Sequence, residues 1–242
     1  MTASLSLTES QITTALGAFL MGILPSGVEV VRGLDNRVPE PKSDDYVEVI
    51  PLLRERLETN VEAYTDVAGV GSIAGATLTI TEMLAGAFAV GQSLTGTGVS
   101  PNTSISALGT GTGGDGTYTI TPAQTVASTV LQAGSKSSLQ PIKITFQIDA
   151  HGPHSGDNAQ IISTLLRDDY AVQTFAASGF DVAPLYVVDP RQLAFVNGEQ
   201  QFEERWTIDA VLQANPIILT PMQFADEITI GIINTDAAYP PT

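Results

Sequence analysis

The chain has 242 residues, enough for one or two domains, and contains no cysteine, which excludes a disulfide framework, a thiolate metal site and a cysteine nucleophile. Its formal net charge is −16, which excludes an ordinary DNA-binding module, because nucleic-acid affinity depends on Lys and Arg displacing counterions. No apolar stretch approaches the roughly 18–20 residues of a membrane span, and the N-terminus lacks a signal-peptide pattern. We therefore expect a soluble protein that is neither secreted nor in contact with a membrane.

The first 67 residues predict one helix followed by strands. Thr8 and Gln11 form a capping-box pattern at a helix start. Apolar residues then recur at helical spacing and predict a one-sided helix that ends near Gly22; they are Ile12, Leu16, Phe19, Leu20 and Ile23. Residues 28–32, 46–53 and 60–67 predict strands. The apolar stripe indicates core packing, with a partner-binding helix as the alternative.

An extended arm is predicted between the first two of these strands. Pro39 and Pro41 flank Glu40, and residues that precede proline avoid the helical region. The arm is either a simple connection or a segment that lies on a neighbouring molecule.

Residues 69–134 differ abruptly from the rest of the chain. Their only charged residues are Glu82 and Asp115, and they hold 13 of the 22 glycines. Short alternating segments separated by Gly-rich turns predict a small antiparallel sandwich or barrel; these segments are residues 77–80, 87–90, 103–107 and 117–121. A composition change this sharp predicts a separate domain inserted into a host domain.

The glycine run at residues 109–116 resembles a phosphate-binding loop in its letters alone. It contains no lysine and lies between predicted strands rather than at a helix start, so the phosphate-binding mechanism is missing. Turn glycines are the better interpretation.

The second half of the chain returns to the host pattern. Residues 143–149 predict a strand, and Asp157 is placed to cap a helix that runs to about Ala176. Residues 184–188 predict a short strand and residues 203–213 a long one, in which Trp206 and every second residue after it face one side. Residues 228–232 predict a last strand, and we expect a loose tail from Thr235.

The two histidines lie in the pattern Asp149, His151, His154, Asp157. Metal sites need side chains that converge, and this spacing crosses a strand end, a Gly-Pro turn and a helix cap. Ser155 beside His154 lacks an oxyanion hole and an orienting third group. We therefore predict no metal site, no cofactor and no catalytic residues.

A charged turn, Asp189 to Gln192, follows the strand at residues 184–188. Its Arg191 could bind a carboxylate in a bidentate manner, whereas the simpler interpretation is a solvated turn.

Together these elements predict an α+β host domain, with two helices and a mostly antiparallel or mixed sheet. The host comprises residues 1–68 and 135–242, and the inserted all-β sandwich or barrel comprises residues 69–134. The host carries all 10 basic residues and all but two of the 26 acidic ones.

Several strings of the host, read in order, resemble the tail terminator (neck) proteins of contractile-tailed phages. They are LLRDDYA (165–171), PLY (184–186), DPRQ (189–192), ERWT (204–207) and LQANP (212–216). The resemblance covers the host from its first helix to its last strand. Residues 91–96 and 113–119 separately resemble Gly/Thr-rich β modules of phage virion proteins, and a large insert after Val67 departs from the compact family pattern.

The resemblance implies a structural virion protein, assembled in the host cytoplasm, that forms a ring, usually a homohexamer. The ring would cap the tail tube and sheath, end tail polymerisation and join the tail to head-completion or collar proteins. DNA would pass through its lumen without specific binding, which suits an acidic protein. We expect the ring or neck contacts to include Pro39, Glu40 and Pro41, and the turn residues Asp189, Arg191 and Gln192. The alternative function is a tail-associated adhesion module that uses the inserted domain.

Overall fold

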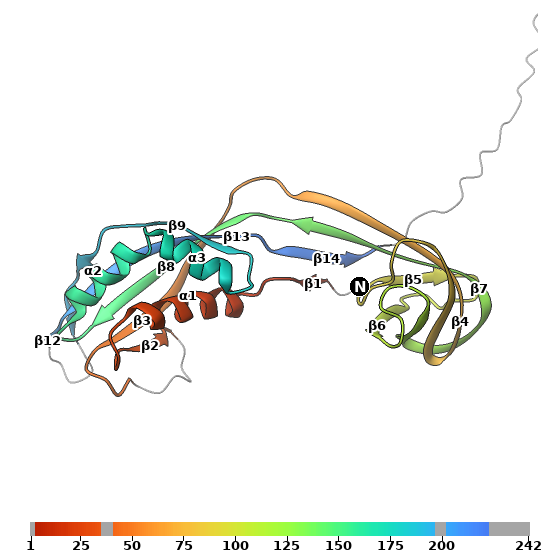
Figure 1. Ribbon diagram of the computed structural model, residues 1–242, viewed down its shortest axis with the longest axis horizontal. Helices are drawn as coiled ribbons and strands as arrows, with labels where there is room; N and C mark the ends of the chain where they lie inside the picture. Colours follow the sequence, from red (N-terminus) through yellow and green to blue (C-terminus); the bar gives the residue numbers. More distant parts are fainter. Residues whose placement is uncertain (1–2, 35–40, 197–201, 223–242) are drawn as a thin grey trace, which may run out of the picture. The chain divides into compact units, whose positions relative to one another are not determined.

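The computed structural model describes residues 3–34, 41–196 and 202–222. Its contacts divide the chain into two compact units (Figure 1). Within the described residues, the helix-covered unit lies in 3–63 and 137–219, and the Gly/Thr unit comprises 64–136 and 220–222. The division into a host domain, residues 1–68 and 135–242, and an inserted domain, residues 69–134, stays a prediction.

A six-stranded sheet forms the frame of the helix-covered unit. Its strand order is β10-β13-β8-β3-β2, and β9 also pairs with β13. Among the described pairs of this sheet, β2 and β3 pair in parallel and the others are antiparallel. The strands are β2 (Glu29–Arg32), β3 (Tyr46–Arg56), β8 (Ile142–His151), β9 (Val182–Val187), β10 (Arg191–Gln192) and β13 (Arg205–Ala214). A mixed, mostly antiparallel sheet agrees with the predicted α+β class.

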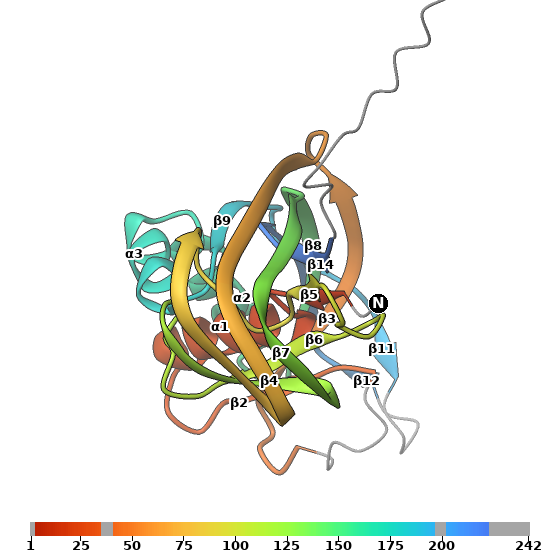
Figure 2. The ribbon, with the colours of Figure 1, turned by 90° about the vertical axis from the view of Figure 1, so that its right-hand side faces the viewer.

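Three helices, rather than the predicted two, accompany this sheet in the described part of the chain (Figure 2). They are α1 (Glu9–Ile23), α2 (Ser155–Leu165) and α3 (Asp169–Ala177). The Thr8–Gln11 capping box of α1 is confirmed.

The single helix predicted from Asp157 to Ala176 is wrong, because the chain becomes extended at Asp168 and starts again as α3. The Asp168 carboxylate caps the new helix by accepting a hydrogen bond from the backbone N–H of Tyr170 at 2.8 Å. Asp157 lies inside the first turn of α2, where a carboxylate is favoured by the helix dipole, and is not its cap.

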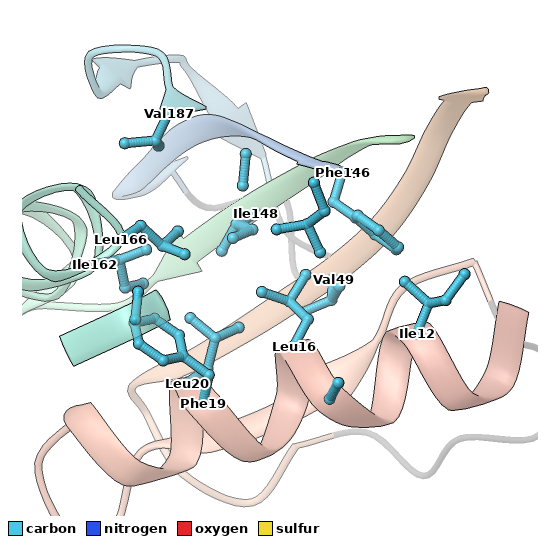
Figure 3. Packing of buried hydrophobic residues seen from close by; sticks show 14 of the residues in the cluster. Ile12, Leu16, Phe19, Leu20, Val49, Phe146, Ile148, Ile162, Leu166 and Val187 are labelled. Atoms are coloured by element: carbon cyan, nitrogen blue, oxygen red, sulfur yellow. The ribbon is translucent and has the colours of Figure 1, made fainter. Parts of the chain in front are cut away.

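The core of this unit lies between the sheet and the helices (Figure 3). Leu16 and Leu20 of α1 meet Phe146 and Ile148 of β8, and Ile162 of α2 closes the layer. All five side chains are fully buried. Burial of a large apolar side chain contributes about 1.5–3 kcal/mol, so this layer dominates the stability of the unit.

The strands of the Gly/Thr unit belong to a second sheet, of order β1-β14-β7-β5-β6 with β4 also on β7. Two of them are long, and each contains residues of both units. The strands of this second sheet are β1 (Ser4–Leu5), β4 (Val61–Ala85), β5 (Ser93–Gly96), β6 (Ser104–Leu108), β7 (Gly116–Leu139) and β14 (Ile217–Pro221); β1 and residues 217–219 of β14 belong to the helix-covered unit. The strand predicted at residues 87–90 is wrong: this segment is a loop that places the Phe88 side chain in the core.

The glycine run before β7 is a turn built around Tyr118. The Tyr118 hydroxyl accepts a hydrogen bond from the backbone N–H of Gly113 at 3.1 Å and donates one to the carbonyl of Gly114. A Cβ at Gly111 would lie 2.6 Å from the Tyr118 ring. Glycine is required there by a close approach, and the turn interpretation of residues 109–116 is confirmed.

Candidate functional site

The predicted turn residues lie at one edge of the six-stranded sheet, where β9 gives way to β10. Arg167 donates to the Asp189 carboxylate at 2.7 Å and to the carbonyl of Val187 at 2.8 Å. Arg191 donates through one nitrogen to the Asp209 carboxylate at 2.9 Å. Arg191 therefore binds a carboxylate of its own chain, and both ion pairs involve exposed side chains that contribute little to stability.

The described end of the predicted arm, at Pro41 and Lys42, lies beside the other edge of the same sheet. Pro39 and Glu40 fall outside the described residues. Pro41 is half-buried, and the backbone N–H of Lys42 donates to the Glu29 carboxylate of β2 at 3.1 Å. Because β2 and β10 are the two ends of the strand order, Pro41 and the turn belong to opposite edges and do not form one site.

Large apolar side chains are exposed along the β9–β10 edge, and the sequence analysis missed them. Leu185 is 43% exposed, Tyr186 50%, Val188 40% and Leu193 40%. The pairing of β9 with β13 shifts register at Leu185, which is a β-bulge of the kind found at sheet edges. Pro184 in the same strand was the signal for an edge strand.

The structure separates the two histidines. His154 has its ring Nδ1 2.8 Å from the Asp45 carboxylate, which also accepts from the His154 backbone N–H at 2.8 Å. The hydrogen bond to Asp45 raises the pKa of His154, and the negative charges of Asp45 and Asp157 add to the shift. His151 is paired instead with Glu203, whose carboxylate lies 3.0 Å from its Nδ1.

Ser155 does not behave as a nucleophile next to His154. Its side chain is fully buried, and its hydroxyl has no hydrogen-bond partner within the described ranges. A serine nucleophile needs a base within hydrogen-bond reach. This geometry gives no support to hydrolysis at Ser155.

Comparison with known protein families decides the class of the chain. Residues 107–236, more than half of the sequence, match the family described as phage neck terminator protein. The chain belongs to that family. No curated protein matches it.

Membership in the neck terminator family assigns the chain a structural role in the tail or neck of a virion, together with other tail or head proteins. The matched region starts within β6 and contains the helices α2 and α3 and the β9–β10 edge. The family is structural rather than enzymatic. Among the described helices, none combines the length and the apolar character that crossing a membrane requires.

Proposed function

We propose that this neck terminator forms a closed ring, a homohexamer, on the end of a contractile tail. The ring caps the tail tube and sheath, ends their polymerisation and presents a surface to head-completion or collar proteins. The observation that carries this proposal is that the edge formed by β9 and β10 exposes large apolar side chains within the matched region. Exposed apolar groups gathered at a sheet edge are typical of an interaction surface.

The geometry of the two edges supports a ring. In a cyclic oligomer above a dimer, each subunit uses two different surfaces, one toward each neighbour. The β9–β10 edge, with Asp189, Arg191 and Gln192, supplies one surface. The opposite edge, at β2 and the arm with Pro41, supplies the other. We propose that the arm of one subunit lies on the β9–β10 edge of the next.

The net charge of −16 suits a ring through which DNA passes. Acidic side chains repel phosphates, so a lumen lined by them lets DNA move without sticking. We propose that the surplus of acidic residues in the helix-covered unit serves this purpose.

Adhesion through the predicted inserted segment, residues 69–134, has less support. The only aromatic residues at 69–134, Phe88 and Tyr118, are 2% and 1% exposed. Neither is available for stacking on a sugar ring, which is a common means of glycan recognition. We therefore do not propose a receptor-binding function for this segment.

Electron microscopy and light scattering of the purified full chain, with and without tail tubes, test the ring. We expect closed rings for the wild type, and monomers for a variant with both Leu185→Glu and Leu193→Glu, because the two charges would be buried without partners. The matched control is Leu84→Glu, which changes a 53% exposed leucine of the Gly/Thr unit and should leave the rings intact. A wild-type chain that stays monomeric under all these conditions would contradict the proposal.

A further inference from the structure

Three side chains of metal-ligand type meet on the face of the six-stranded sheet that points away from the hydrophobic core. Glu48 of β3 is the register partner of Asp149 of β8. His151 follows two residues later and therefore lies on the same face as Asp149. One ligand atom from each of these three residues lies within 4.8 Å of the other two.

Two of the three side chains are buried with an atom that has no partner. Asp149 and His151 are each 2% exposed. Asp149 Oδ1 and His151 Nε2 have no hydrogen-bond partner among the described residues. An unsatisfied buried polar atom costs about 1–3 kcal/mol. A ligand that binds both Asp149 Oδ1 and His151 Nε2 would remove this cost.

The His151 ring is held in the orientation of a metal ligand. Its Nδ1 lies 3.0 Å from the Glu203 carboxylate, and its ring stacks on Tyr46 with the centroids 4.5 Å apart. A carboxylate accepts, so Nδ1 donates to Glu203, and in the neutral form of the ring Nε2 then has the lone pair that a metal binds. Metal-bound histidines commonly donate their second ring N–H to a carboxylate in this way.

The charges around His151 favour a cation. Glu48 and Asp149 are opposite each other on neighbouring strands, an arrangement that repels like charges. Glu203 adds a third carboxylate. Asp149 Oδ2 lies 3.8 Å from Nη1 of the cation Arg205 and accepts a hydrogen bond from the Gln147 amide at 2.8 Å. Three carboxylates beside one guanidinium leave two negative charges, which one divalent cation would neutralise.

We propose that Glu48, Asp149 and His151 bind a divalent first-row transition cation of the Zn²⁺ type, with Glu203 as the positioning residue for His151. An imidazole together with carboxylates suits Zn²⁺, whereas Mg²⁺ and Ca²⁺ prefer oxygen ligands alone. Ligand atoms at the Zn²⁺ distances of about 2.0–2.1 Å stand roughly 3.3 Å apart. The three ligand atoms, which lie within 4.8 Å of one another, would reach that spacing by rotation of the Glu48 and Asp149 side chains.

The test is titration calorimetry of the full chain, freed of metal with a chelator, against ZnCl₂ and against MgCl₂. We expect one Zn²⁺ per chain and no comparable binding of Mg²⁺. His151→Gln should abolish the site, and Glu48→Gln should weaken it at least tenfold. Glu203→Gln should weaken it by about 10- to 100-fold, as for other residues that orient a metal-bound histidine.

The matched control is His154→Gln, since His154 is the other histidine, is exposed and has its own carboxylate partner. This variant should bind Zn²⁺ like the wild type. Circular dichroism in chelator shows whether each variant is folded. Independently of any variant, ¹⁵N spectra of the wild type should show Zn²⁺ shifting Nε2 of His151. Absence of saturable Zn²⁺ binding, binding that depends on His154 instead, or a preference for Mg²⁺ would each overturn the proposal.

Discussion

The two compact units bury their hydrophobic cores with different secondary structure. The helix-covered unit places apolar faces of three helices against one face of a sheet, and charged residues lie on the other face of the sheet and on the helices. The Gly/Thr unit has a smaller core drawn from strands and loops, and its segment 69–134 holds two charged residues. The first unit is stabilised by large interlocking side chains, whereas the second depends on turns that only glycine fits.

Removing a core side chain from each unit tests this difference with the largest expected effect. Phe146→Ala should lower the unfolding free energy of the helix-covered unit by about 3–5 kcal/mol, because it removes a fully buried ring. Trp206, the only tryptophan, packs against the same core, so its fluorescence in urea reports this unit.

Leu78→Ala is the matching change in the Gly/Thr unit, where Leu78 is fully buried. It should lower the unfolding free energy of that unit by about 2–5 kcal/mol. The urea midpoint that Trp206 fluorescence reports should not change. If both variants shift the Trp206 midpoint equally, the two units unfold as one and the comparison fails.

Replacing Gly111 or Gly114 by alanine should lower the unfolding free energy of the Gly/Thr unit by unequal amounts. Gly111→Ala places its Cβ 2.6 Å from the buried Tyr118 ring, and overpacking of this kind costs about 1–3 kcal/mol. Gly114→Ala meets nothing within 4 Å and should stay within about 0.5 kcal/mol of the wild type. Calorimetry measures both, and hydrogen exchange in β7 locates the change. Equal effects would show that the turn is not packed around Tyr118.

The smallest expected effect is a pH dependence near neutrality that belongs to the helix-covered unit alone, since both histidines lie there. The Asp45 carboxylate raises the pKa of His154 above its ordinary value of 6.5. The stabilisation from this pair is therefore complete below pH 6.5 and is lost as the pH rises through the raised pKa. Because His154 is exposed, the effect on stability is small.

An NMR titration of His154 measures this shift directly. Asp45→Asn should lower the midpoint toward 6.5, because it removes the charged partner. Resonances of residues 69–134, which contain no histidine, should not move over the same range. A midpoint that is unchanged in the variant would show that Asp45 is not the cause.

Local patterns predicted most of the secondary structure of the helix-covered unit. The Thr8–Gln11 cap, the stripe of α1 and the alternation around Trp206 each depend on neighbours in the chain, and each is confirmed. The break between α2 and α3 was missed, because the apolar periodicity continues across it while Asp168 competes locally as a cap. The turn at Asp189 was placed correctly, yet its ion pairs to Arg167 and from Arg191 to Asp209 join residues about 20 positions apart.

The sequence by itself determined the neck terminator resemblance, the acidic character of the chain and the abrupt change of composition at residues 69–134. These properties are visible there because each depends on residue type and order along the chain. Only the tertiary structure decided that His151 and His154 have different partners, that Glu48 lies opposite Asp149, and that Pro41 and the Asp189 turn belong to opposite sheet edges. The physical reason is strand register, which joins residues about 100 positions apart through long-range packing and hydrogen bonding that no local spacing encodes.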